Sequence, residues 1–435
     1  MQNYRSKNNN KNQIEIMSPA GSYESLMAAI KAGANSVYFG VEHLNMRART
    51  IAFKLKDLKK IANICKKHNV KSYLTLNTIV YDQDMKMVKK ICDAAKKAKI
   101  SAIIACDIAT IEYARKINLE VHISTQQNIS NIEAVKFFSK YSDVVVLARE
   151  LTLPQIKKIV QEIKQKNIRG PNGKLVKVEL FAHGALCVSI SGKCYMSLAQ
   201  YGASANRGMC LQACRRSYKV IDEETGDELV VDNKYIMSPK DLCTIGFLDK
   251  LLDAGISVLK LEGRGRSPEY VYAVTKCYRE AVDSYFNGTY TKQKIADWTK
   301  RLEEVFNRGF WHGGYYLGKK LGDWSGVYGS KAEKEKTYLG YVKNFFAKHN
   351  VAQIVIETGK ISIGDEILIQ GPTTGVLQFK LTDLHVNEKS AQIGKKGDDV
   401  TIKVSEKVRK NDKVYVFGKK EKLQENSILK QKNAC

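Results

Sequence analysis

Short apolar runs alternate with amphipathic stretches along residues 13–263 of the chain. In Ser22–Gly33 and Lys56–Asn69 the apolar residues recur at helical spacing, which predicts surface helices. The runs between such stretches are short and rich in β-branched residues, which predicts buried strands. Eight strands are predicted: residues 14–21 (IEIMSPAG), 36–40 (SVYFG), 71–77 (KSYLTLN), 101–107 (SAIIACD), 119–126 (LEVHISTQ), 143–150 (DVVVLARE), 176–184 (VKVELFAHG) and 257–263 (SVLKLEG). Strand followed by helix, eight times over, predicts an α/β fold of the (β/α)8 TIM-like barrel type.

The main competing fold is a doubly wound open sheet. Such a sheet usually carries a glycine-rich phosphate loop, G-x-G-x-x-G, after its first strand. Residues 18–25 are SPAGSYES and do not match that loop. The pattern therefore favours the barrel.

The barrel also predicts where the chemistry lies, because active sites of such barrels form at the carboxyl ends of the strands. Polar residues at those ends are the candidate site residues. They are Asn77, Asp107, Gln126, Arg149, Glu150, His183, Glu262 and Arg264, with Gly21, Gly40 and Gly184 beside them.

The pattern changes after the eighth strand. Residues 267–288 and 297–318 predict two further helices, the second leading into an aromatic, glycine-rich segment. Residues 329–336 (GSKAEKEK) are polar and predict a linker, and the short alternating runs of residues 337–420 predict a small antiparallel β-barrel. We therefore expect a barrel domain over 13–328, a β domain over 337–420, a disordered basic tail over 1–12 and a second tail over 421–435.

The connection between the seventh and eighth strands is about 70 residues long, far beyond the usual barrel loop. This cysteine-rich insertion, about residues 185–245, carries Cys187, Cys194, Cys210, Cys214 and Cys243 and a basic stretch, NRGMCLQACRR. The chain starts without an apolar leader, so its ten cysteines are not expected to form a disulfide framework. Those that can be explained singly, as core or chain-end residues, are Cys65, Cys92, Cys106, Cys214, Cys277 and Cys435.

Four of the clustered cysteines have the spacing C-x6-C-x15-C-x32-C: they are Cys187, Cys194, Cys210 and Cys243. This spacing is too irregular for zinc-finger knuckles, and it also misses the usual ferredoxin runs. Glycine and small residues flank three of the four, and four thiolates suit either zinc or an iron–sulfur cluster. Buried free thiols are the plain alternative for any single cysteine.

A cysteine nucleophile is a further alternative, and it needs a nearby base. His183 and His122 are the histidines expected to line the barrel. The sequence has no H-E-x-x-H, G-x-S-x-G or Walker A motif. The residues alone therefore disfavour a hydrolase.

The charge adds a partner to this picture. Lys and Arg number 71 against 45 Asp and Glu, a net charge of +26 in 435 residues. A genome rich in adenine and thymine inflates Lys, but it inflates Glu as well. So positive a field attracts polyanions, which predicts an RNA partner. No apolar run reaches the ~18 residues needed to span a bilayer, so we expect a cytoplasmic protein with no membrane partner.

The stretch ELFAHGALCVSISGKCYMS, residues 179–197, resembles a family signature. It fits E-x-F-x-x-G-[SA]-[LIVM]-C-x4-G-x-C-x-[LIVM]-S at every defined position. That signature belongs to the collagenase-like peptidases, peptidase family U32. The resemblance continues through ANRGMCLQACR, MSPKDLC and LKLEGRGRSPEYVYAVTKCYREAVD, and back to SPAGSYESLMAAIKAGANSVYFG.

Within this family the chain most resembles the prephenate-dependent tRNA uridine hydroxylases, which make 5-hydroxyuridine at the wobble position. The resemblance implies an iron–sulfur cluster, expected to be 4Fe–4S, on Cys187, Cys194, Cys210 and Cys243. Cys214 is left out of this set, and its replacement of Cys210 as a ligand is the alternative, because the two lie close in the sequence. The resemblance also implies tRNA as substrate, held by the basic surface and the C-terminal β-barrel. Alternative activities in the family are a peptidase and hydroxylation of ribosomal RNA or a quinone precursor. A non-catalytic RNA-binding protein with structural zinc is a further alternative.

The implied cosubstrate, prephenate, is a small dianion, and paired guanidiniums bind carboxylates in bidentate fashion. The candidate residues for binding it are Arg149, Arg207, Arg215 and Arg264, with Arg266 also near the predicted mouth. The candidates for proton transfer or for orienting these arginines are Glu150, His183 and Glu262.

Overall fold

The computed structural model describes residues 14–46, 53–229, 235, 237–318, 324–327 and 329–420. The expected tails at 1–12 and 421–435, and Cys435 with them, lie outside this range. The chain divides into two compact units, residues 1–331 and 332–435. No helix in the described part of the chain is long and apolar enough to cross a membrane.

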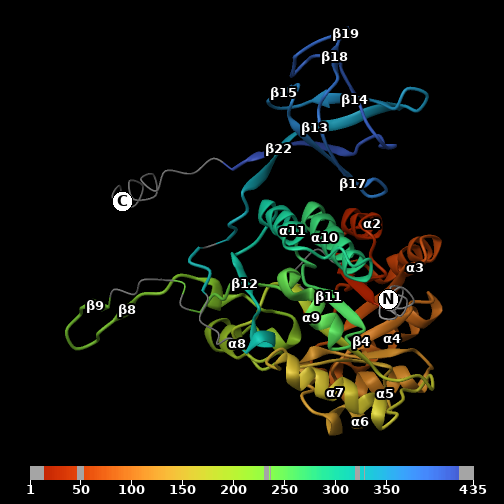
Figure 1. Ribbon diagram of the computed structural model, residues 1–435, viewed down its shortest axis with the longest axis vertical. Coiled ribbons are helices and arrows are strands. Elements are labelled where there is room, and N and C mark those ends of the chain that lie inside the picture. Colours follow the sequence, from red (N-terminus) through yellow and green to blue (C-terminus); the bar gives the residue numbers. More distant parts are fainter. Residues whose placement is uncertain are drawn as a thin grey trace. The chain divides into compact units, whose positions relative to one another are not determined.

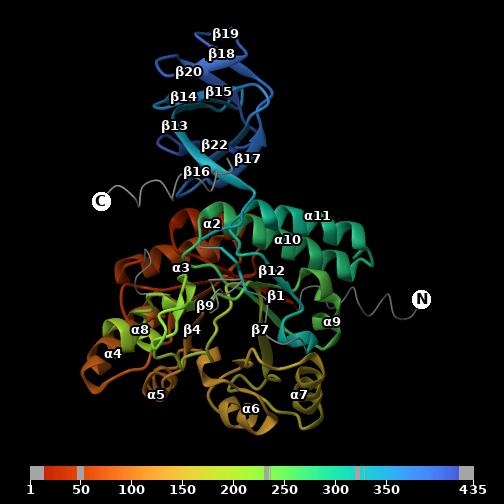
Figure 2. The ribbon, with the colours of Figure 1, turned by 90° about the vertical axis from the view of Figure 1, so that its left-hand side faces the viewer.

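The first unit is the predicted eight-stranded parallel barrel (Figures 1 and 2). All eight predicted strands are confirmed: β1 Glu15–Pro19, β2 Ser36–Phe39, β3 Lys71–Leu76, β4 Ala102–Ala105, β5 Val121–Ile123, β6 Val144–Val146, β7 Lys177–Gly184 and β11 Val258–Leu261. Each strand pairs in parallel with the next, and β11 pairs with both β7 and β1. The sheet is therefore closed.

Amphipathic helices cover the outside of the barrel. In α3 (Leu58–Lys67), Leu58, Ile61, Ala62 and Cys65 are buried at helical spacing against the strands, as the pattern predicted. The other covering helices are α2 Tyr23–Lys31, α4 Met85–Lys97, α5 Ile108–Lys116, α6 Ile132–Ser139, α7 Leu153–Gln165, α9 Leu248–Asp253, α10 Pro268–Phe286 and α11 Lys292–Glu304. Their buried faces and the strands form one large apolar core.

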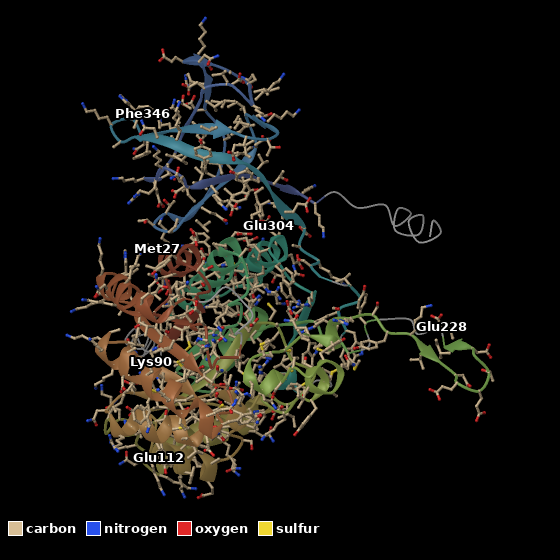
Figure 3. The ribbon with its side chains drawn as sticks, turned by 180° about the vertical axis from the view of Figure 1, so that it is seen from behind. Met27, Lys90, Glu112, Glu228, Glu304 and Phe346 are labelled. Carbon is tan, nitrogen blue, oxygen red and sulfur yellow. The ribbon has the colours of Figure 1, made fainter. Side chains whose placement is uncertain are left out.

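The cysteine-rich insertion runs from β7 to β11 and contains short elements: α8 Met196–Tyr201, β8 Val220–Ile221, β9 Glu228–Leu229 and β10 Asp241–Cys243. β10 pairs antiparallel with the end of β7, and β12 (Phe310–His312) pairs with β10, so two strands that the pattern did not predict extend the sheet. The β8–β9 hairpin projects away from the barrel, and Glu228 on it lies far from Lys90 and Glu112 on the outer helices (Figure 3).

The second unit is all β and antiparallel, as predicted. Its strands are β13 Lys334–Phe346, β14 Val351–Ile356, β15 Lys360–Ser362, β16 Glu366–Gly371, β17 Gly375–Lys380, β18 Leu384–Val386, β19 Lys389–Ser390, β20 Ile393–Lys395, β21 Val400–Lys403 and β22 Lys413–Lys419. Eight of them form one sheet, and β15 and β20 form a second. They enclose a separate apolar core. β13 begins at Lys334, inside the stretch expected to be a linker.

Candidate active site

A cavity of about 170 Å³ lies at the carboxyl ends of the barrel strands, where the fold predicts an active site. We call it the inner cavity. Its wall includes Tyr38, Thr75, Ser124 and Phe181 from the barrel and residues 187–194 from the insertion. The insertion therefore closes the barrel mouth on one side.

Four cysteines line the inner cavity: Cys187, Cys194, Cys210 and Cys214. Cys187 follows β7, Cys194 precedes the short helix α8, Cys210 lies in the loop after α8, and Cys214 lies within the 3-10 turn Ala213–Arg215. A hydrogen bond from the Leu211 amide to Ser197 Oγ (2.9 Å) joins the loop after α8 to that helix. Gly192 has φ +73°, and an added Cβ would lie 2.8 Å from Gln126 Cγ, so the loop packs closely on the end of β5.

The thiols of these four cysteines act on one another. Burial raises the pKa of Cys214 to about 11, Arg215 opposes this rise, and Cys187, Cys210 and Cys194 add to it. Four thiolates this close repel one another unless a cationic centre holds them. The arrangement therefore suits a metal cofactor better than it suits four free thiols.

Cys214, and not the expected Cys243, completes this group. Cys243 is fully buried in β10, opposite His183 of β7, and it belongs to the apolar core of the barrel. It lines none of the cavities at the mouth. Burial raises its thiol pKa to about 12, which is the state of an inert core thiol.

The donor set limits what a metal cofactor at this site could be. Among the described residues, no three His, Cys, Asp or Glu side chains are placed to hold a single metal ion. The four cysteines line one cavity, and thiolates are ligands of both zinc and iron–sulfur clusters.

A second cavity, of about 200 Å³, adjoins the inner cavity, and we call it the arginine cavity. Arg149, Arg215, Arg266 and Arg308 line it. The two cavities share wall residues, among them Cys187, Cys210, Cys214, Arg149 and Glu262. The arginine cavity also borders a third cavity, which we call the outer cavity and which Arg216 and Phe306 help to line. Cysteines and guanidiniums thus face a common space.

Two of these arginines stack on aromatic rings, and one of the two has an unsatisfied buried donor. Arg149 stacks over the Phe181 ring at 4.5 Å, and its Nε is buried with no hydrogen-bond partner in the described structure. Arg266 stacks on the Phe306 ring at 3.4 Å. Burial lowers the pKa of Arg266, Glu262 opposes this, and neighbouring Arg308 lowers it further. Buried cations that repel one another in this way are typical of an anion-binding site.

The other arginine candidates are engaged elsewhere. Arg264 lines the inner cavity, but its Nη1 donates to Asn45 Oδ1 (3.1 Å) and Thr75 Oγ1 (2.6 Å). Arg215 donates to Ser238 Oγ and to the carbonyls of Pro239 and Leu186.

Arg207 lines neither cavity. It pairs with Asp84 Oδ2 at 2.7 Å and stacks over the Tyr81 ring. Its expected role in cosubstrate binding is therefore not supported, because it is committed to fastening the insertion to the loop before α4.

Of the two glutamates expected to transfer protons or orient the arginines, one lines the cavities and the other does not. Glu262, directly after β11, lines both the inner and the arginine cavity. Gly184 has φ +105°, and an added Cβ would lie 2.6 Å from the Glu262 carbonyl, so a glycine is needed for this approach. Glu150 is exposed and lines neither cavity. Glu262 is therefore the carboxylate that the structure places in the site.

The His183 side chain is buried among aromatic rings and lies outside both cavities. Its ring lies among the rings of Tyr270, Tyr278 and Phe310, with centroids 5.5–6.2 Å away. Burial lowers its pKa to about 3, against a smaller opposing effect of Glu262. It does not line the inner or the arginine cavity, so a direct catalytic role is not supported. His122 is likewise buried, with its ring 4.5 Å from the Tyr73 ring.

One charged pair in the inner cavity was missed by sequence reasoning. Lys260 lines the cavity, is only 5% exposed, and donates from Nζ to Glu179 Oε1 at 2.7 Å. Its ammonium lies 4.9 Å from the Tyr38 ring and 5.5 Å from the Phe181 ring. The signal was available, because Lys260 interrupts the apolar run of the eighth strand and Glu179 opens the signature stretch.

Comparison with known proteins places this site in a family. A model of peptidase family U32 matches residues 21–325. A protein named collagenase from Porphyromonas gingivalis is 54% identical over 413 residues, 95% of this chain and all of that protein. The tRNA hydroxylation protein P1 of Bacillus subtilis is 32% identical over 301 residues, 68% of this chain and 69% of that protein. The 23S rRNA 5-hydroxycytidine C2501 synthase of Escherichia coli is 35% identical over 273 residues, 62% of this chain and 40% of that protein.

The family match begins just after β1 and covers the other seven barrel strands and the cysteine-rich insertion, and the Porphyromonas relative extends the similarity over nearly the whole chain. The signature residues from Glu179 to Ser197 run from within β7, through the loop that lines the inner cavity, into the start of α8. The chain belongs to peptidase family U32.

Proposed function

We propose that this protein is an RNA-modifying enzyme that hydroxylates a tRNA uridine, the wobble uridine, at carbon 5. It acts in the cytoplasm, with an iron–sulfur cluster held by Cys187, Cys194, Cys210 and Cys214 and with prephenate as cosubstrate. One observation carries the proposal: a group of four thiols and a group of guanidiniums line adjoining cavities with a common wall. This arrangement supports the proposal of neighbouring sites for a redox centre and an anionic cosubstrate.

Two further observations support an RNA substrate. Relatives that cover two thirds of this chain, from Bacillus subtilis and Helicobacter pylori, are named tRNA hydroxylation proteins. The net charge of +26 also suits a polyanionic partner. The cavity at the barrel mouth is small, so a base of the RNA has to leave its stack to enter it.

The chain's own residues have separate tasks in this scheme. When bound, an iron–sulfur cluster supplies a site for electron transfer or for polarising an oxygen atom. The guanidiniums of Arg149 and Arg266 hold the anionic cosubstrate, while Glu262 can hold or release a proton at the wall shared by both cavities. The insertion closes one side of the mouth, which reduces the access of water to the inner cavity.

A peptidase is the second candidate, because the Porphyromonas relative at 54% identity is named collagenase. The described residues do not support it chemically. The buried His183 does not reach the cysteines' cavity, and no three His, Cys, Asp or Glu side chains are placed to hold a hydrolytic metal ion.

Purified protein distinguishes the two candidates. Anaerobically prepared protein is incubated with unmodified tRNA and prephenate, and separately with denatured collagen. Formation of 5-hydroxyuridine in wild type, lost on Cys187→Ser, supports the hydroxylase. Cleavage of collagen that survives Cys187→Ser, with tRNA unchanged, contradicts it and favours the peptidase.

A further inference from the structure

The arginine cavity carries more positive charge than the carboxylate in its wall balances, and its arginines are partly or fully buried. Four arginines line it, and Glu262 is the carboxylate in its wall. Asp241, 2% exposed and just outside, pairs with Arg308 across 3.4 Å. Cations held out of water need a counter-charge, because desolvation is costly for each ion.

The individual contacts show which guanidiniums are available to a ligand. Arg215 already donates hydrogen bonds to Ser238 Oγ and to the carbonyls of Pro239 and Leu186. Arg266 makes a stacking contact with Phe306 and no hydrogen bond or ion pair with any other described side chain. Arg149 leaves its buried Nε unsatisfied. Two stacked, oriented guanidiniums with free donors therefore face one small cavity.

Stacking fixes the plane of each guanidinium before a ligand arrives. Arg149 is held by Phe181 of β7, and Arg266 by Phe306, which follows α11. Phe306 also lies 5.1 Å from the guanidinium of Arg308. A planar fork that is already oriented loses little entropy when it binds a carboxylate in bidentate fashion.

We propose that Arg149, Arg266 and Arg308 form a subsite for a small ligand with two acid groups, one bound by Arg149 and the other by Arg266 with Arg308. This inference rests on the proposed function and deepens it, since it assigns the cosubstrate's binding residues. These residues take the place of Arg207 and Arg264 as candidates for binding the cosubstrate. Arg207 pairs with Asp84, and Arg264 donates hydrogen bonds to Asn45 and Thr75. Arg266 and Arg308 lie about 40 residues apart in the sequence, on opposite sides of α10 and α11.

The ligand's size and charge follow from the cavity. At about 200 Å³, the arginine cavity has room for a small molecule, and Arg266 and Arg308 also line the outer cavity of about 480 Å³. The position of the arginine cavity beside Cys187, Cys210 and Cys214 places that molecule next to the thiols. A dicarboxylate is therefore favoured over a monocarboxylate, which leaves one guanidinium unmatched.

Direct binding tests this assignment without requiring any catalysis. Isothermal titration calorimetry is performed on the full-length protein, prepared anaerobically, with prephenate, with the monocarboxylate phenylpyruvate and with uridine 5′-monophosphate. Arg266→Met is the main variant, because that side chain has no described ion pair to break. Arg169→Met, at an exposed arginine on the loop before β7, is the matched control.

We expect prephenate to bind wild type and the Arg169→Met protein equally, and Arg266→Met roughly 10- to 100-fold more weakly. The double variant Arg308→Met/Asp241→Asn, which leaves no carboxylate unpaired, weakens binding in the same way. Phenylpyruvate binds wild type more weakly than prephenate does.

Wild-type affinity in both Arg266→Met and the double variant overturns the assignment. So does uridine monophosphate binding that replaces prephenate and is lost in the same variants, because the cavity is then a nucleotide phosphate site. Failure of the proposed function is separate: tRNA that stays unmodified while prephenate still binds through Arg266 leaves the subsite intact. Conversely, tRNA hydroxylation that is unaffected by Arg266→Met contradicts the assignment of the subsite, while the proposed hydroxylase function stands.

Discussion

Individual side chains at the barrel mouth divide into those that face the cavities and those that support them. Cys187, Cys194, Cys210 and Cys214 face the inner cavity, whereas Cys243 packs in the core. Sequence spacing could not make this distinction, because Cys210 and Cys214 are close in sequence and a loop can present either. Only the fold shows that β10 directs Cys243 into the apolar interior.

This division predicts unequal effects of two substitutions. Cys214→Ser removes a thiol from the cavity wall, so we expect iron and acid-labile sulfide per chain to fall severalfold after anaerobic purification. Cys243→Ala removes a small buried side chain, which costs about 1–2 kcal/mol of folding free energy but leaves iron and sulfide at the wild-type level. Loss of iron in Cys243→Ala, with Cys214→Ser unaffected, contradicts the assignment.

The buried pair Lys260–Glu179 predicts a stability effect that can be separated from function. Lys260→Met leaves the Glu179 carboxylate buried without its partner, which we expect to lower the free energy of unfolding by about 3–5 kcal/mol. The double variant Lys260→Met/Glu179→Gln removes both charges and recovers most of that loss. Urea denaturation measures both. If the single and double variants are equally unstable, the ion pair is not the cause.

His183 predicts how stability depends on pH. An exposed imidazole titrates near 6.5, whereas burial lowers the pKa of His183 to about 3 in the folded protein. Between these two pKa values the unfolded chain binds a proton at His183 and the folded chain does not. The free energy of unfolding therefore decreases as the pH falls from about 6.5 toward 3. The loss amounts to at most roughly 5 kcal/mol.

His183→Gln should flatten the curve of unfolding free energy against pH across this interval. Thermal denaturation at several pH values, compared with the wild type, reads out the slope. Identical slopes in the two proteins mean that other groups are responsible for the acid sensitivity.

At the scale of elements, the eight barrel strands could be predicted because each is a compact apolar run between helices with a clear apolar face. β10 (DLC) and β12 (FWH) could not be predicted, because neither lies in a β-branched apolar run between two helical stretches. Their pairing depends on the end of β7, which is far away in the sequence. Arg308 lies just before β12. The pairing of β12 with β10, which was not predicted, therefore brings Arg308 to the arginine cavity.

The insertion is fastened to the barrel by a contact that predicts local motion. Arg207 donates to Asp84, and the Ile79 amide donates to the Asn206 carbonyl at 3.1 Å. Arg207→Met removes the ion pair, so we expect faster hydrogen exchange in residues 205–216 by mass spectrometry. Prephenate affinity should stay within about twofold of the wild type, because Arg207 lines neither cavity. A large loss of affinity would restore Arg207 to the site.

At the scale of the whole molecule, the two units have separate apolar cores, so each contains the packing that a folded domain needs. Both cavities lie within the first unit. A chain of residues 1–331 should therefore retain iron, sulfide and prephenate affinity. We expect it to bind tRNA more weakly than the full chain in filter-binding assays, and equal tRNA affinity would show that the C-terminal unit does not contribute.

Binding of tRNA should also depend on salt. Contacts between lysines or arginines and phosphates release counterions, so affinity for tRNA should fall by roughly tenfold or more between about 50 and 200 mM salt. Affinity for prephenate should change much less, because one small dianion makes far fewer charge contacts than an RNA strand. An affinity for tRNA that does not change with salt would argue against the charge as the basis of RNA binding.

The most direct test of the central claim is nucleoside mass spectrometry on bulk tRNA from cells that lack this gene and carry it again on a plasmid. We predict that 5-hydroxyuridine and its derivatives disappear on deletion and return with the wild type and with Cys243→Ala, but not with Cys214→Ser. Unchanged 5-hydroxyuridine in the deleted strain would contradict the tRNA hydroxylase account and direct the search to ribosomal RNA or to a peptidase activity.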